Sequence, residues 1–175
     1  MDKTYRDEYS RQFVVDQMPG SFSPADPHLQ IYDNYISDTR LRFRRIRIPG
    51  RPEWKRMLQQ RVPGDDHIKL SEIFLDDAEY RALGSYDGNE IRKNRYFAEH
   101  DDVTLICDLY LGRLAGLKSV KIEFSTPEER DAFVFEAPAI EVTGNPFFDG
   151  SNLYDKGFAD VERELEEVVR GSRGE

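Results

Sequence analysis

Hydrophobic and polar residues alternate along several short segments of the chain. In Leu41–Ile48 (LRFRRIRI), Arg42 and Arg44 fall on the strand face opposite Phe43, because successive side chains of a strand point to opposite faces. Ser119–Phe124 alternates in the same way. Many short strands with few helices between them favour a barrel or a sandwich. The other segments with strand character are Glu8–Val15, Ile68–Leu75, Ile91–Phe97 and Val103–Leu111.

Helix signals occur at three places. A short helix is expected after Asp76 or Asp77, either of which can cap it. A second is expected at Thr126, where the sequence TPEE places proline at the first helical position and glutamate at the third. A third, over about 155–170, has apolar residues at helical spacing and an acidic outer face, so we expect it on the exterior of a barrel. The predicted fold class is α+β, mainly antiparallel β.

The composition bounds the size and the compartment of the protein. With 175 residues, 38% of them hydrophobic, the chain is expected to form one domain over residues 1–175. It contains no run of about 18 apolar residues, so no membrane association is expected. Its single cysteine, Cys107, excludes an internal disulfide and fits a reducing compartment. We therefore expect a cytoplasmic protein.

Positive charge is concentrated in one segment of an acidic chain. The net charge is −9, yet the stretch from Arg40 to Arg61 holds nine Arg or Lys residues against Glu53 alone. An acidic protein repels a nucleic-acid backbone, and nucleic-acid binding generally needs a broad basic face. DNA or RNA is therefore not expected as a partner. A small polyanion that reaches a sheltered basic strand fits the pattern better.

Charged and aromatic stretches follow one another in a specific order. They are EYSRQFVV from Glu8, IYDNYI from Ile31, LRFRR from Leu41, RKNRY from Arg92, CDLYLGRLAGL from Cys107, VKIEF from Val120 and EVTGNPFF from Glu141. This order, with the G-x-L-A-G-L turn, resembles that of the CYTH, or triphosphate tunnel, family. The resemblance covers about residues 8–153. It implies a closed or nearly closed antiparallel tunnel barrel with peripheral helices.

In that family, inward basic side chains hold a linear triphosphate. Arginine offers a bidentate fork to phosphate oxygens, and lysine offers a mobile point charge. The resemblance therefore implies a phosphate-binding role for basic residues on the matching strands, and a small polyanion such as triphosphate or a nucleotide as partner. The phosphate-binding candidates are Arg42, Arg44, Lys93 and Arg95, with Arg61 as a further one.

Inward carboxylates hold divalent metal in the same family. Mg²⁺ or Mn²⁺, bound by oxygen ligands, polarises the phosphoryl group and activates water. The resemblance assigns this role to the acids that match the family pattern, and salt bridges to Arg42, Arg44 and Lys93 explain the same acids equally well. The metal-ligand candidates are Glu8, Glu72, Asp108 and Glu123.

Several family acids are replaced in this chain. The opening E-x-E-x-K motif has Ser10 and Gln12 at its second and third charged positions. Leu70, Ile106 and Lys121 stand where further acids are expected. The motif is degenerate, so metal binding and hydrolysis are expected to be weakened, whereas the basic residues are better preserved.

Three functions follow from these residues. The first is a metal-dependent triphosphate phosphohydrolase with reduced activity. The second is a non-catalytic sensor of polyphosphate or nucleotide, which keeps the basic residues without the metal. The third is a structural barrel that binds another protein. The fold alone does not choose among them.

Overall fold

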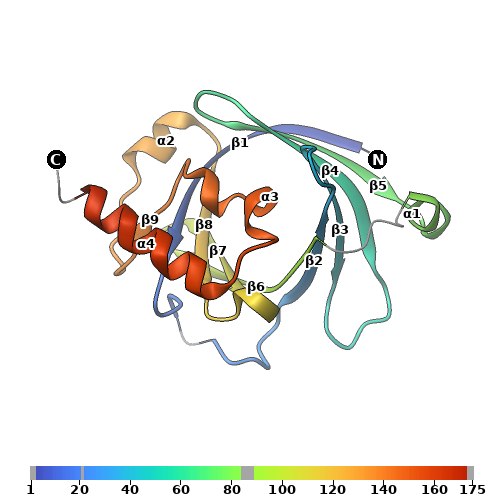
Figure 1. Cartoon of the computed structure of the whole chain (residues 1–175), viewed down its shortest axis with the longest axis horizontal. Coiled ribbons are helices and arrows are strands. Elements are labelled where there is room, and N and C mark those ends of the chain that lie inside the picture. Colours follow the sequence, from blue (N-terminus) through green and yellow to red (C-terminus); the bar gives the residue numbers. More distant parts are fainter. Residues whose placement is uncertain (1–2, 21, 84–88, 173–175) are drawn as a thin grey trace.

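The computed structural model describes residues 3–20, 22–83 and 89–172, which form one antiparallel sheet closed into a barrel (Figure 1). The predicted fold class is therefore confirmed. The strands are β1 (Lys3–Val14), β2 (Leu29–Tyr35), β3 (Leu41–Arg47), β4 (Lys55–Pro63), β5 (Ile68–Leu75), β6 (Glu90–His100), β7 (Val103–Tyr110), β8 (Lys118–Phe124) and the short β9 (Ile140–Glu141).

Strand β1 closes the barrel because its two halves pair with different neighbours. Its first half, Lys3–Glu8, pairs with β5, and its second half, Tyr9–Val14, pairs with β8. The order around the barrel is β5-β4-β3-β2-β6-β7-β8-β1, and β1 returns to β5. Strand β9 extends the sheet at the end of β1.

The three predicted helices are present, and the first two begin at their predicted capping residues. Asp76 Oδ1 accepts hydrogen bonds from the backbone N–H groups of Ala78 and Glu79, and Thr126 Oγ1 accepts one from Glu129. The C-terminal helix begins at Phe158 rather than near 155. The helices are α1 (Asp77–Leu83), α2 (Pro127–Ala132), α3 (Gly150–Leu153) and α4 (Phe158–Ser172), with 3₁₀ turns η1 (Gly112–Leu114) and η2 (Pro146–Phe148).

One hydrophobic core lies on the outer side of the barrel wall. Val120 and Ile122 are fully buried in it, whereas Lys121 between them lines the interior. Loop residues such as Phe22 and Phe133 cover this outer face. The inner face of these strands therefore carries polar residues, unlike that of a barrel whose centre is filled by apolar side chains. The buried members of this core are Phe13, Val15, Tyr96, Leu105, Cys107, Val120 and Ile122.

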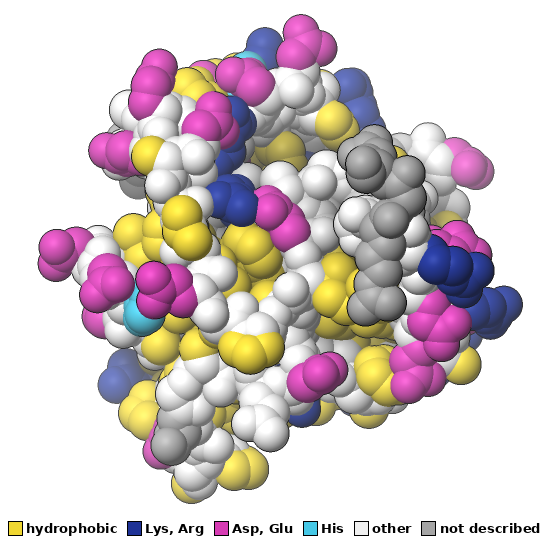
Figure 2. Space-filling model, turned by 90° about the vertical axis from the view of Figure 1, so that its left-hand side faces the viewer, with side chains coloured by type: hydrophobic (Ala, Val, Ile, Leu, Met, Phe, Trp, Pro, Cys, Tyr) yellow, Lys and Arg dark blue, Asp and Glu magenta, His cyan; other side chains and the backbone are white. Residues whose placement is uncertain are grey.

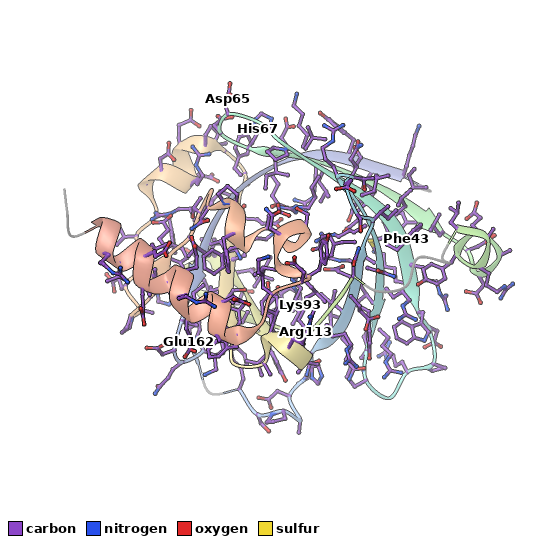
Figure 3. The ribbon with its side chains drawn as sticks, in the orientation of Figure 1. Phe43, Asp65, His67, Lys93, Arg113 and Glu162 are labelled. Carbon is purple, nitrogen blue, oxygen red and sulfur yellow. The ribbon has the colours of Figure 1, made fainter. Side chains whose placement is uncertain are left out.

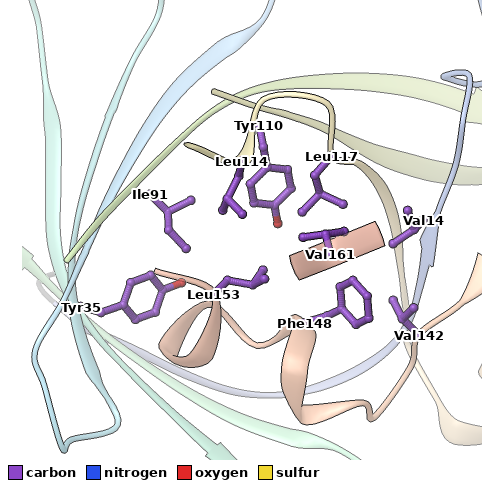
Figure 4. Close-up of a cluster of buried hydrophobic side chains, with 10 residues drawn as sticks. All are labelled: Val14, Tyr35, Ile91, Tyr110, Leu114, Leu117, Val142, Phe148, Leu153 and Val161. Carbon is purple, nitrogen blue, oxygen red and sulfur yellow. The ribbon is translucent and has the colours of Figure 1, made fainter. Parts of the chain in front are cut away.

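A second hydrophobic cluster joins the C-terminal segment to one end of the barrel (Figure 4). Phe148 and Leu153, from η2 and α3, pack there with Tyr35 and Tyr110 of the wall, and Val161 of α4 packs on the same cluster. In Figure 1, α3 lies inside the ring of strands. The segment from β9 to α3 therefore enters the barrel and lines its interior, and α4 packs against this segment through Val161.

The face at the left of Figure 1 is shown in Figure 2. Charged side chains of both signs project from this face, and hydrophobic atoms are visible between them. Within the described part of the chain, no helix is long and apolar enough to cross a membrane.

Candidate functional site

The barrel encloses a cavity of about 940 Å³ lined by charged side chains from every strand of the closed ring. In Figure 3, Lys93 lies inside the barrel outline, whereas Phe43 lies on the side of β3 that faces α1. Cations outnumber carboxylates on the inner strand faces. The cations are Arg6, Arg42, Arg44, Arg61, Lys93, Arg95 and Lys121, and the carboxylates are Glu8, Asp33, Glu72, Asp108 and Glu123.

Asp33 on β2 is shared by two arginines of β3. Its carboxylate accepts two hydrogen bonds from Arg44, at 2.6 and 2.7 Å, and lies 3.5 Å from Nη1 of Arg42. Arg42 also donates to Gln59 and to the Tyr35 hydroxyl. Burial favours the neutral carboxyl group, but the charges of Arg42 and Arg44 outweigh burial and lower the pKa of Asp33.

Asp108 on β7 is shared in the same way by two cations of β6. Arg95 donates two hydrogen bonds to it, at 2.7 and 2.8 Å, and Lys93 Nζ lies 2.6 Å from Oδ2. The two cations lower the pKa of Asp108 against the opposing effect of burial. For Lys93, burial outweighs the attraction of Asp108 and lowers the pKa to about 8.

Glu8 and Glu123 belong to one network with three cations. Arg61 and Lys121 each approach a Glu8 oxygen to 3.1 Å, and Lys121 Nζ also lies 2.5 Å from Glu123 Oε1. Arg6 donates to Glu123 at 2.8 Å. Burial opposes ionisation of Glu8, but Lys121 and Arg61 outweigh it and lower the pKa of this carboxyl group.

Glu72 on β5 has neutral partners. Thr4 Oγ1 donates to one of its oxygens at 3.0 Å, and the Gln59 side-chain amide donates to the other. Both partners face Glu72 across the sheet, on β1 and β4. This carboxylate is held by hydrogen bonds.

Two residues at positions where the resemblance predicts charged side chains, Ser10 and Gln12, face this network across the sheet. In the pairing of β1 with β8, Ser10 lies opposite Glu123 and Gln12 lies opposite Lys121. Ser10 Oγ is 3.4 Å from Glu8 Oε1. Lys121 therefore supplies a cation across the strand pair from Gln12, the position at which the resemblance predicts a lysine.

Residues outside the ring of strands also line the cavity. They are Asp65, Asp66 and His67 of the β4–β5 hairpin, Arg130 and Asp131 of α2, and Asp149 before α3. Figure 3 shows Asp65 and His67 at the tip of that hairpin. Aspartates thus predominate among these residues, whereas cations outnumber carboxylates on the inner strand faces.

The carboxylates present do not form a ready metal site. Glu8, Asp108 and Glu123 are engaged with lysine and arginine, and Glu72 accepts from Thr4 and Gln59. Within the described ranges, no group of three or more His, Cys, Asp or Glu side chains is arranged to hold a metal ion. A divalent ion would have to displace an ammonium or guanidinium group from these oxygens. Metal ligation by the four acids stays a prediction.

All residues predicted from the sequence line the same cavity, although their roles remain predictions. They are Arg42, Arg44, Arg61, Lys93, Arg95, Glu8, Glu72, Asp108 and Glu123. Sequence reasoning missed Asp33, Gln59 and Arg6. For Asp33 there was a signal, because it is an acid that shares a strand face with the hydrophobic residues Ile31 and Tyr35.

The chain has a CYTH-like tunnel-barrel fold, and solved structures with this fold are similar to it. One is the crystal structure of the inorganic triphosphatase NE1496, with a TM-score of 0.56 and 21% identity over 84% of this chain and 93% of that one. Another, of the hypothetical protein NE1496, gives a TM-score of 0.57 and 22% identity over 86% of this chain and 99% of that one. Neither a protein-family model nor a curated protein sequence matches the chain. At these identities the likeness establishes the fold.

Proposed function

We propose that the barrel binds a small polyanion, a linear triphosphate or the triphosphate group of a nucleotide, in its central cavity. The proposal rests on one observation: cations outnumber the buried carboxylates with which they pair. Asp33 and Asp108 are each shared by two cations, and Glu8 and Glu123 together are shared by three, Arg6, Arg61 and Lys121. Each of these three groups keeps one positive charge in excess. Uncompensated charge in a sheltered site is costly, so an anionic ligand is the natural complement.

The geometry of the arginines supports the same ligand. Arg44 and Arg95 each use Nε and Nη2 to bind one carboxylate, which fixes the plane of the guanidinium group. Arginine carries five N–H donors, so further donors remain on each fixed group. Donors held in place before the ligand arrives lose less entropy on binding. The cavity therefore suits an anion with several oxygens.

For the reaction, we propose slow metal-dependent hydrolysis of triphosphate or none. The solved neighbour described as an inorganic triphosphatase supports hydrolysis. The replacements at Ser10, Leu70, Ile106 and Lys121 and the ion pairs of the remaining acids oppose it. Those ion pairs favour the alternative of a non-catalytic sensor, because they engage the oxygens that a metal would need. When bound, Mg²⁺ or Mn²⁺ would supply charge stabilisation at the phosphoryl group.

A calorimetric titration with tripolyphosphate, in EDTA and then with Mg²⁺ or Mn²⁺, tests the proposal when followed by a measurement of phosphate release. Binding with slow release supports the hydrolase, and binding without release supports the sensor. Absence of binding in every condition refutes a polyanion site and leaves a barrel that binds another protein.

A further inference from the structure

Lys121 holds a place between two carboxylates that come from different strands. Its Nζ lies 3.1 Å from Oε2 of Glu8 on β1 and 2.5 Å from Oε1 of Glu123 on its own strand, β8. The Glu8 side chain is 1% exposed, so water cannot compensate its charge. An ammonium group that bridges two carboxylates occupies the position that a bridging cation takes in an acidic site.

Two further cations contact these carboxylates. Arg61 binds Glu8 and Arg6 binds Glu123, at 3.1 and 2.8 Å. Three cationic side chains of the protein thus surround two carboxylates. A divalent ion that entered here would have to displace the Lys121 ammonium and would meet the charges of two guanidinium groups. The network is saturated with cations.

We propose that Lys121 is a built-in counter-ion that replaces a divalent metal between Glu8 and Glu123, and that anion binding by this protein is therefore independent of metal. The second part rests on the proposed function; the first does not. A lysine tethered to β8 is present at the site under all conditions, whereas a dissociable metal varies with its concentration. Occupancy of the cavity therefore depends on the concentration of the anion and not on that of a metal.

The burial of Lys121 is consistent with this role. Its side chain is 19% exposed and it lines the cavity with the carboxylates. Burial lowers the pKa of Lys121, and the charges of Glu8 and Glu123 oppose that effect. The ammonium group is therefore held by its two carboxylates, and they in turn are kept ionised by it.

Removal of the ammonium group tests the assignment directly. In Lys121→Met, the chain keeps a long side chain but loses the charge, and Glu8 and Glu123 become available to an added cation. Mn²⁺ binding is measured by electron paramagnetic resonance, with no other ligand present. We expect Mn²⁺ to bind this variant at least about tenfold more tightly than the native protein, which is the change in affinity typical of one charge-assisted contact. Lys69→Met, at an exposed lysine on β5, is the matched control and should behave as the native protein.

Thermal unfolding extends the test to a variant that folds poorly. Loss of Lys121 leaves Glu8 with fewer partners, so the variant is expected to be less stable, and Mn²⁺ should raise its melting temperature more than that of the native protein. No gain in Mn²⁺ affinity and no rescue of folding by Mn²⁺ would overturn the assignment. Tight Mn²⁺ binding by the native protein, abolished by Glu8→Gln, would do the same.

A titration of the native protein separates the two proposals. Tripolyphosphate affinity should be equal in EDTA and in Mg²⁺, and an absolute requirement for Mg²⁺ would contradict metal-independent binding. If the native protein binds no tripolyphosphate at all, the proposed function fails, and the Mn²⁺ comparison still decides the role of Lys121.

Discussion

The carboxylate of Asp33 and the guanidinium group of Arg44 form a two-pronged pair inside the barrel, with Nε–Oδ1 and Nη2–Oδ2 distances of 2.6 and 2.7 Å. Asp33 is 1% exposed and Arg44 7%. A buried pair of this kind contributes little net stability over an apolar pair, but breaking it leaves a charge without a partner. Asp33 is therefore best understood as the residue that holds Arg44, and Arg42 beside it, in position.

Asp33→Asn should destabilise the protein strongly. The change keeps the shape of the side chain but leaves two buried arginines without their carboxylate, at a cost of about 3 kcal/mol or more in the free energy of unfolding. Urea denaturation measures this. Tripolyphosphate should recover part of the lost stability, because the anion can supply the missing negative charge.

The exposed pair of Arg45 and Glu90 provides the control. These groups lie 3.5 Å apart, with side chains 35% and 38% exposed. Glu90→Gln should change the free energy of unfolding by less than about 1 kcal/mol, as for most surface ion pairs. Equal destabilisation by both variants would show that Asp33 has no special role.

Arg44→Ala should weaken tripolyphosphate binding. Loss of one charge-assisted contact is worth about 1.5 to 3 kcal/mol, or roughly a tenfold to hundredfold change in affinity. Arg45→Ala removes an arginine from the next position of β3, where the side chain packs on Tyr32 and Trp54 outside the barrel. Calorimetry should show near-native affinity for this control. Unchanged affinity in a folded Arg44→Ala protein eliminates Arg44 as a ligand.

Lys93 should make anion affinity fall as the pH rises. Burial lowers the pKa of Lys93 from 10.5 to about 8, so its ammonium group is lost between about pH 7 and about pH 9. Asp108 keeps its charge over this window because its pKa is lowered. Titrations across the window should show a decrease in affinity that is smaller in Lys93→Arg, where the charge persists. The ionisation of tripolyphosphate is common to both proteins.

The stability of the protein should rise with pH, whereas its affinity for the anion falls. Between about pH 8 and about pH 10 the unfolded chain binds more protons at Lys93 than the folded chain, because the folded pKa is the lower one. The free energy of unfolding attributable to Lys93 therefore rises with pH over this range. Native protein whose stability has the same pH dependence as Lys93→Met contradicts the assigned shift.

Gly150 should be intolerant of a side chain. A Cβ added there would overlap the phenol ring of Tyr35, which is buried and accepts a hydrogen bond from Arg42. Gly150→Ala is expected to lower the free energy of unfolding by about 1 to 3 kcal/mol, as for other overpacked sites. Gly171→Ala, in α4 with no atom within 4 Å of an added Cβ, should be neutral or slightly stabilising by thermal denaturation. Equal effects would mean that α3 does not pack tightly in the barrel.

The sequence predicts those strands that have one apolar face and one charged face. In β3 and β8 the apolar residues alternate with charges, and the structure places Phe43 and Val120 outside and Arg44 and Lys121 inside. Strand β4 was not anticipated. Its sequence KRMLQQRVP has Gln59 facing the cavity and a similar polar content on its outer side, so alternation gives no signal.

The site was predictable by residue type but not by its pairing. Alternation along each strand places the charges inside, yet the partners come from neighbouring strands far apart in sequence, as when Arg61 meets Glu8. Register decides these contacts, and it depends on the whole closed sheet. The entry of α3 into the barrel depends on packing around Gly150 and also had no local signal.

Building a metal site beside Glu8 should require removal of Lys121. Ser10→Glu places a carboxylate on β1 beside Glu8 and across from Glu123, on the same strand face. While Lys121 bridges the two existing carboxylates, this new acid adds only another ion pair. Ser10→Glu combined with Lys121→Gln instead offers oxygen ligands without a competing ammonium group. Phosphate release from tripolyphosphate with Mn²⁺ should exceed the native rate in this double variant and not in Ser10→Glu alone.

Gln12→Lys should compensate for the loss of the Lys121 charge, because it places a cation opposite residue 121. Introduced alone it faces Lys121, and like charges directly opposite each other destabilise a strand pair by roughly 0.2 to 1 kcal/mol. Introduced with Lys121→Gln, it transfers the charge from β8 to β1 and should cost less. The triple variant should therefore be more stable than the double variant and at least as active, as judged by urea denaturation and phosphate release. A folded triple variant with no activity above native would mean that Leu70 or Ile106 also prevents metal binding, and that Lys121 is only one of several barriers to hydrolysis.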